Sequence, residues 1–199
     1  MKQFIFGLCF VVLTVAMRYR ATHRDAPVAT SEQSREHGPP AAPWTNYVLP
    51  DAPGWARETP EDRGPADGVS VRYRSLRGTA YADLFVYRGP EGLSREREAL
   101  DREVERACDG VRQAVSVGAY ERAAFYWSTR HMPFGGAEYS WVRFTVTQRG
   151  VTRASEVYVT THRAFFVKLR VTYNDENPPS DDTRDVHALV TAVGEAAQP

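Results

Sequence analysis

Hydrophobic and polar residues follow two different spacings along this chain. In several stretches they alternate one by one, which is typical of β-strands with one side facing a core. In two others the apolar residues recur every three or four positions, which is typical of an amphipathic helix. The predicted strands cover residues 69–75, 79–88, 121–132, 137–147, 155–160 and 165–173, and the predicted helices lie within 93–115 and 181–196.

The last predicted strand shows the alternation most clearly. Its apolar side is predicted to face the core together with two valines of the preceding strand. The predicted inward set is Val157, Val159, Phe165, Val167, Leu169 and Val171. The residues between the inward positions of this last strand, Phe166, Lys168 and Arg170, are predicted to face outward.

The first predicted helix carries an apolar stripe that includes a cysteine. The stripe consists of Leu100, Val104, Cys108, Val111 and Val115. Cys108 is predicted to be an inert buried residue, because the sequence places no base or cationic group beside it that would favour a thiolate. Ser94 is the predicted N-cap of this helix.

An acidic linker, NDENPPSDD, precedes the C-terminal helix. Ser180 or Asp181 is its predicted N-cap, and Asp182 and Asp185 would interact with the positive end of the helix dipole. The spacing of these carboxylates matches no calcium-binding loop and lacks its central glycine, so no metal site is predicted here.

The order of these elements predicts an α+β fold. Only the first helix supplies a connection long enough for parallel strand pairing. We therefore expect a mainly antiparallel sheet of about six strands with two helices, one between strands 2 and 3 and one C-terminal. Both helices are expected on the same face of this sheet.

The N-terminal region contains an apolar segment and a polar linker. Residues 1–17 are predicted to be a signal peptide or a membrane anchor, because the uncharged run at 4–17 is shorter than the roughly 20 residues of a spanning helix. The arginines that follow it would favour an uncleaved anchor, and an ordinary buried helix is the third alternative. Residues 18–43 are predicted to be a flexible linker and residues 44–199 a single domain.

Composition, charge and cysteine content limit what this chain can be. The 199 residues are 42% hydrophobic, which is enough for one sizeable core. The formal net charge is zero, which argues against nucleic-acid binding through a broad basic field. If the segment containing Cys9 is removed, Cys108 has no partner for an intramolecular disulfide.

Sequence motifs for catalysis and for cofactor or metal binding are absent. The chain has no G-x-S-x-G, P-loop, G-x-G-x-x-G, H-E-x-x-H or C-x-x-C motif. No catalytic residue, cofactor or metal ligand is therefore predicted, and His162 is expected in an exposed hairpin turn. An enzyme with a dispersed site remains an alternative, which a deep pocket holding two or more of Asp83, His131, Glu138 and His162 would favour.

One sheet face is the candidate binding surface. If both helices cover the inward set, the opposite face carries aromatic and basic side chains of the kinds enriched at binding hot spots. The six candidate binding residues are Trp141, Arg143, Tyr158, Phe166, Lys168 and Arg170. Thr160 is predicted to lie on the same face. The alternative is a solvated face whose side chains form cross-strand pairs.

The order of elements, the lead-in ending in Gly54-Trp55, and the FFVKLRVTY strand before an acidic linker and a terminal helix resemble the PsbP/Mog1-like fold. The resemblance covers roughly residues 45–196. It implies a fold shared with small exported bacterial domains and a mostly non-enzymatic function. Plant PsbP proteins assist photosystem II and Mog1 binds a small GTPase, but no binding residue of either can be matched here.

These observations favour a non-catalytic, exported accessory or binding domain of the cell envelope. Its partner would be another envelope protein or an anionic polymer. One alternative is a membrane-anchored component of an envelope assembly, which contacts the membrane through residues 4–17. The other is the enzyme with a dispersed site.

Overall fold

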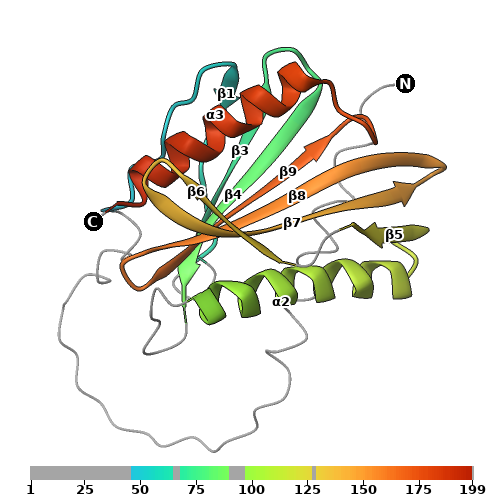
Figure 1. The fold of residues 1–199 in the computed structure, drawn as a ribbon, viewed down its shortest axis with the longest axis horizontal. Coiled ribbons are helices and arrows are strands. Elements are labelled where there is room, and N and C mark those ends of the chain that lie inside the picture. The colour runs from blue at the N-terminus through green and yellow to red at the C-terminus, as the bar shows by residue number, and fades with distance from the viewer. Residues whose placement is uncertain (1–45, 65–67, 90–96, 127–128, 199) are drawn as a thin grey trace, which may run out of the picture.

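The computed structural model describes residues 46–64, 68–89, 97–126 and 129–198. The predicted signal peptide or anchor, the linker and the Ser94 cap lie outside these residues. Within them the chain forms nine strands and two helices in one α+β unit (Figure 1). No helix in these residues is both long and apolar enough to cross a membrane.

The strands form one sheet, and every described pairing is antiparallel. The order across the sheet is β1-β3-β4-β9-β8-β7-β5, with β2 also paired to β3 and β6 also paired to β7. The strands are β1 Trp55–Arg57, β2 Glu61–Asp62, β3 Val69–Ser75, β4 Ala80–Arg88, β5 Arg122–Phe125, β6 Arg130–Phe134, β7 Ala137–Gln148, β8 Val151–His162 and β9 Phe165–Tyr173. The helices are α2 Arg97–Ser116 and α3 Ser180–Ala196.

The predicted antiparallel sheet is confirmed, with more strands than the expected six. Two short strands, β1 and β2, come from the proline-rich lead-in and pair with β3. The stretch predicted as one strand over 121–132 forms β5 and β6 instead, and each pairs with a different half of β7. Short strands at both ends of the sheet limit its open edges.

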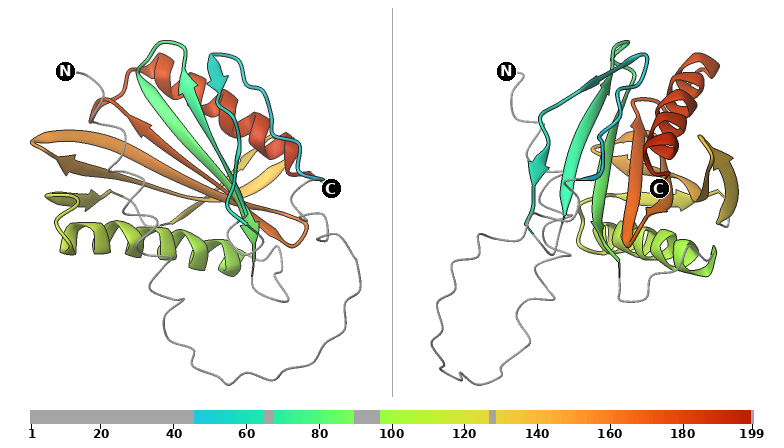
Figure 2. Two further views of the ribbon diagram at one scale, coloured as in Figure 1. Left: turned by 180° about the vertical axis from the view of Figure 1, so that it is seen from behind. Right: turned by 90° about the vertical axis from the view of Figure 1, so that its left-hand side faces the viewer.

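The prediction that both helices share one sheet face is wrong. Helix α3 packs on one side, where its Leu189 and Val193 join a core with β3, β4 and β9. Helix α2 packs on the other side, where Val104 and Val111 join a second core with β7 and β8. Figure 2 shows the sheet edge-on with α3 standing on one side of it. The domain therefore has three layers, and its central strands are buried on both faces.

The register of the β8–β9 hairpin explains this difference. Residues directly opposite each other on paired strands point to the same face. Tyr158 pairs with Leu169, and Val159 pairs with Lys168. Lys168 contacts Glu103 of α2, so its neighbour Val159 faces α2, whereas Leu169 lies in the core under α3. The predicted inward set is buried throughout, but its β8 and β9 members belong to different cores.

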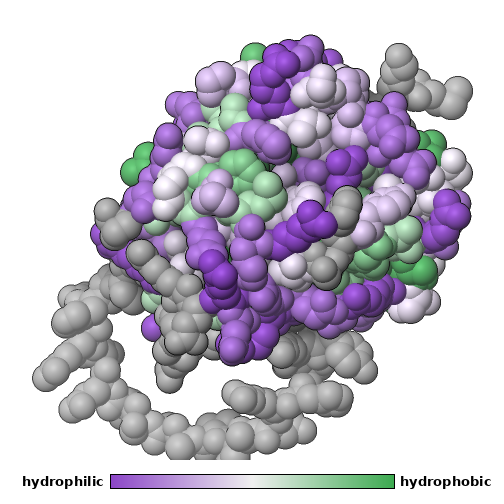
Figure 3. Space-filling model, viewed as in Figure 1, coloured by the Kyte–Doolittle hydropathy of each residue, from purple (hydrophilic) through white to green (hydrophobic). Residues whose placement is uncertain are grey.

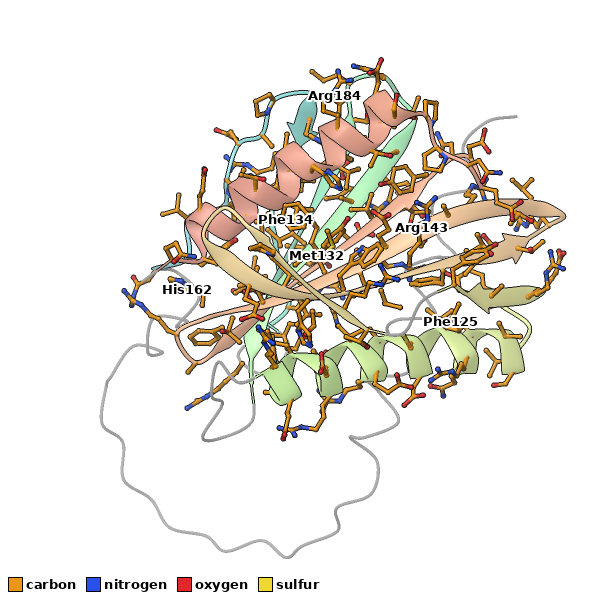
Figure 4. The ribbon with its side chains drawn as sticks, in the orientation of Figure 1. Phe125, Met132, Phe134, Arg143, His162 and Arg184 are labelled. Atoms are coloured by element: carbon orange, nitrogen blue, oxygen red, sulfur yellow. The ribbon has the colours of Figure 1, made fainter. Side chains whose placement is uncertain are left out.

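Two glycines allow α3 to contact the β6–β7 turn closely. A Cβ atom on Gly135 would lie 2.1 Å from the carbonyl oxygen of Thr191, and Gly135 also has a φ of +53°. A Cβ atom on Gly194 would lie 2.3 Å from the carbonyl oxygen of Phe134. Both distances are far below any real Cβ contact, so this approach requires glycine on each side. Figure 4 shows Phe134 beside α3.

The start of α3 differs from the predicted cap. The N-cap is Pro179, no side chain caps the helix, and both Ser180 and Asp181 are already helical. Of the two predicted dipole partners, Asp182 does lie in the first turn, together with Asp181. Asp185 lies one turn further on and forms an ion pair with Arg77 at 3.3 Å.

Leu169→Ala should destabilise the domain by about 2–5 kcal/mol, as a large-to-small change in a packed core does. Leu169 is fully buried, whereas Leu76, at 72% exposure, supplies a matched control. Leu76→Ala should change the free energy of unfolding by no more than about 0.5 kcal/mol. Chemical denaturation of both variants measures this, and equal losses would contradict the assignment of β9 to the core.

Cys108 should react slowly with thiol reagents. It is buried in the α2 core, and burial raises the pKa of its thiol to about 11, so that little thiolate forms at neutral pH. We expect labelling of the native protein by a maleimide to be slow and to accelerate on unfolding in urea. Cys108→Ala should cost about 1 kcal/mol of stability. Rapid labelling of the folded protein would show that this side of α2 opens.

Candidate functional site

The structure does not bring the six candidate binding residues together on one face. Trp141, Arg143 and Tyr158 point to the α3 side of the sheet. The other three, Phe166, Lys168 and Arg170, point to the α2 side. The expected single platform is therefore wrong in its geometry, because the paired strands place these two groups on opposite faces.

Several of these residues are also buried. Tyr158 and Phe166 are 1% and 3% exposed and belong to the two cores, and Thr160 is buried as well. The sequence pattern misplaced them because it treated one face of the sheet as free, whereas each face has a helix. A binding role for the half-exposed residues, such as Arg143, stays a prediction.

A buried carboxylate organises the α3 side. Glu156 on β8 accepts hydrogen bonds from the hydroxyls of Tyr158 at 2.8 Å and Tyr173 at 2.9 Å. Arg143, directly opposite on β7, lies 3.6 Å from the other carboxylate oxygen (Figure 4). Burial, with Glu156 beside them, raises the pKa of both tyrosines, so both remain donors. This network holds β7, β8 and β9 together.

A second buried carboxylate organises the α2 side. Glu103 of α2 is 2% exposed and lies 3.4 Å from the Lys168 ammonium of β9. Tyr87 and Arg106 also bond this carboxylate. Burial lowers the pKa of Lys168, and the Glu103 charge opposes that effect. Lys168 was predicted to face solvent, but it is part of the contact between α2 and the sheet.

Part of the α2 side of the sheet has no described helix over it. Helix α2 packs over β5, β7 and β8 and reaches Tyr87 near the end of β4, but no described helix lies over the rest of that side of β3 and β4 (Figure 2, left). A pocket of about 120 Å³ lies there. We define the Arg170 pocket by its lining residues Glu58, Thr59, Glu61, Arg63, Ser70, Val71, Arg72, Tyr81, Asp83, Phe85, Tyr120 and Arg170.

Three parts of the chain form the Arg170 pocket. Its floor consists of residues from β3, β4 and β9, which share the α2 side of the sheet except for Val71, a member of the α3 core. The segment from Glu58 to Arg63 forms one wall, and Tyr120, which follows α2, contributes another. Of the six candidate residues, only Arg170 lines this pocket.

Charged pairs and aromatic rings dominate the pocket. The guanidinium of Arg72 forms two hydrogen bonds with the Asp83 carboxylate, at 2.7 and 3.1 Å, across β3 and β4. It also lies 5.1 Å from the centre of the Tyr81 ring. Arg63 bonds the Ser70 hydroxyl at 2.7 Å and lies 5.7 Å from the centre of the Phe85 ring. These contacts fix the side chains of the floor, and such order favours binding.

The residues named for the enzyme alternative do not converge in this pocket. Asp83 lines it, but His131, Glu138 and His162 do not. His162 is buried at the end of β8 rather than exposed in a turn, with Nδ1 3.0 Å from the carbonyl oxygen of Ala197. No cluster of three potential metal ligands occurs within the described residues.

A serine, a histidine and an aspartate do meet elsewhere, between α2 and the sheet. The Ser140 hydroxyl donates to Asp101 at 2.7 Å and lies 3.4 Å from Nδ1 of His131. Nε2 of His131 lies 3.5 Å from the second carboxylate oxygen of Asp101. Ser140 is fully buried and directs its proton to the carboxylate, so it is not an accessible nucleophile. The cluster attaches α2 to β6 and β7.

Sequence reasoning missed most of the Arg170 pocket. The alternation in β3 and β4 did place Arg72 and Asp83 on the polar side of their strands, and a short hairpin sets them opposite each other. That signal could have identified the floor. The walls could not be found in this way, because Glu58 and Tyr120 lie in segments without a periodic pattern.

Comparison with known proteins supports the fold assignment. No protein-family model matches the chain, and no curated protein sequence matches it. The structure is similar to the solution structure of cyanobacterial PsbP (CyanoP) from Synechocystis sp. PCC 6803, with a TM-score of 0.50. The two sequences are 15% identical, and the match covers 70% of this chain and 81% of that chain. A crystal structure from Bacteroides thetaiotaomicron VPI-5482 gives a TM-score of 0.45 and 11% identity, over 70% of this chain and 41% of the other. The chain thus has a PsbP-like fold, as its element order predicted.

Lys168→Met should lower the free energy of unfolding by about 1–3 kcal/mol, because it removes a cationic partner from a buried carboxylate. Glu103→Leu alone should also destabilise, since it leaves the Lys168 ammonium in a largely buried position. The double variant should lose less than the sum of the two single losses. Urea denaturation of all four proteins measures this coupling, and strictly additive losses would show that the pair contributes nothing.

Proposed function

We propose that this protein is a non-catalytic, exported binding domain of the cell envelope and that the Arg170 pocket is its binding site. The observation that carries the proposal is the uncovered part of the sheet, where ordered arginine and aromatic side chains surround a pocket of about 120 Å³. Sites of this kind, concave with a few convergent polar groups, are the usual places for ligands.

The chemistry of the pocket supports binding rather than catalysis. Its carboxylates are engaged, Asp83 with Arg72, Glu61 with Arg63 and Glu58 with Arg74. Paired carboxylates are poor general bases because the ion pair stabilises the charged form. The lining contains no histidine, cysteine or lysine. An accessory role that depends on recognition is therefore favoured over turnover of a substrate.

Export is proposed from the sequence of residues 1–17, which combines Lys2 with an apolar run of signal-peptide length. The domain is then delivered beyond the cytoplasmic membrane, either released or tethered by the linker at 18–43. Its partner is an envelope protein or polymer that presents a group small enough to enter the pocket.

Fractionation of cells expressing the full chain with a C-terminal tag tests the export step. We expect the protein in the envelope or periplasmic fraction, with a mature N-terminus after about residue 16 if the segment is a signal peptide. An intact N-terminus in the membrane fraction would favour the anchored form. A full-length protein confined to the cytosol would refute export.

Obstruction of the pocket entrance tests the binding step. Thr59 is exposed and lines the pocket, so Thr59→Trp adds a bulky ring there without removing a described contact. Gln113→Trp places the same ring on the exposed side of α2 as a matched control. We expect Thr59→Trp to reduce recovery of an envelope component by about tenfold in quantitative affinity capture, and the control to leave it unchanged. Equal recovery by both variants would remove the pocket from the proposed function.

A further inference from the structure

We infer that the Arg170 pocket recognises a singly charged oxyanion, a carboxylate on a small or peptide ligand, and that Arg170 is the residue that binds it. This inference rests on the proposed function and names its ligand class.

Arg170 differs from the other arginines around the pocket. Arg63, Arg72 and Arg74 each form an ion pair, with Glu61, Asp83 and Glu58 respectively. For Arg170, the described residues provide one hydrogen-bond acceptor, the Tyr120 hydroxyl at 3.2 Å, and no carboxylate within 4.0 Å. The lining itself holds three arginines and three carboxylates, and Glu58 pairs with Arg74 outside it, so among the described residues Arg170 is the lining arginine that has no ion pair.

The guanidinium of Arg170 is also short of acceptors. Its Nε is buried and has no hydrogen-bond partner among the described residues, whereas buried donors are normally paired. The guanidinium lies 5.7 Å from the centre of the Phe144 ring, so one side of it contacts the α2 core. Arg170 is also one of the residues that line the pocket. A ligand oxygen in the pocket would give this guanidinium a further acceptor.

The geometry of the arginine fork indicates the type of anion. A guanidinium matches a planar carboxylate with two parallel hydrogen bonds. A doubly charged phosphate would carry more charge than Arg170 balances, and it would lie near the carboxylates of Asp83 and Glu61. One guanidinium without an ion pair therefore favours a monoanion.

The rest of the ligand is expected to be compact and partly apolar. The guanidiniums of Arg72 and Arg63 lie over the rings of Tyr81 and Phe85, which reduces the ring surface on which a sugar could stack. The Phe85 and Tyr120 rings also line the pocket and would contact an apolar group of the ligand. An aromatic or branched aliphatic carboxylate fits this combination.

Calorimetric titration of the full-length protein with benzoate tests the inference. Benzoate should bind saturably, and benzamide, its neutral isostere, should bind at least about tenfold more weakly. Arg170→Gln should lower benzoate affinity by about tenfold or more, while Arg184→Gln, on the exposed side of α3 (Figure 4), should not. Arg170→Lys keeps the charge without the fork and should fall between wild type and Arg170→Gln.

Further probes identify the source of the anion. N-acetylphenylalanine that binds better than benzoate would indicate a peptide C-terminus, whereas weaker binding would indicate a free small carboxylate. Stronger binding of dimethyl phosphate than of any carboxylate would overturn the choice of carboxylate. Benzoate binding that survives Arg170→Gln, in a variant shown by circular dichroism to be folded, would overturn the inference.

The two proposals can fail separately. Absence of saturable binding of benzoate, N-acetylphenylalanine and dimethyl phosphate to the folded wild-type protein would also overturn the inference. If Thr59→Trp still abolished capture of the envelope component, the pocket would remain the binding site of the proposed function with a ligand of different chemistry.

Discussion

Burial of the central strands on both faces is the constraint on which the rest of this structure depends. Strands β8 and β9 each supply one set of side chains to the α3 core and another to the α2 core. A sheet of this kind needs a cover on each side, and the chain has one helix for each. Helix α3 lies over the middle of its side, whereas α2 covers mainly the part formed by β5, β7 and β8 and contacts β4 and β9 only through residues such as Tyr87 and Lys168. The remaining part, over β3 and β4, is where paired charges and the pocket occur.

The view in Figure 3, from the α3 side, is mostly hydrophilic, with hydrophobic residues near β6 and β5.

The two cores use a similar arrangement to include a carboxylate. Glu156 bonds two tyrosines and faces Arg143 on one side, and Glu103 bonds Tyr87 and faces Lys168 on the other. Glu156 joins three consecutive strands, β7, β8 and β9, and Glu103 joins α2 to β4 and β9. Such networks stabilise little when compared with apolar packing, but they penalise any alternative register that would leave the charge unpaired. They therefore help to specify which strand pairs with which.

The sequence predicted the elements better than their arrangement. Alternation and helical spacing located β3, β4, β7, β8, β9 and both helices, because these periods follow from backbone geometry alone. They could not tell which face each strand directs to which helix. Val159 and Leu169 looked equivalent as inward residues, and only the register of the hairpin, with Val159 opposite Lys168, separates them. The pocket was not predicted: of the candidate binding residues only Arg170 lines it, and its walls come from segments whose position depends on tertiary contacts.

The burial of Lys168 has a practical consequence for work on this protein. Lys2 and Lys168 are the only lysines in the chain, and the Lys168 side chain is 17% exposed and bonded to Glu103. Amine-directed reagents should therefore spare the folded domain and react at the N-terminal end of the chain. Coupling through amines would attach the intact protein to a sensor surface by that end, without modifying any residue that lines the Arg170 pocket. Trypsin would still cut at arginines, but a lysine-specific protease should leave the folded domain intact.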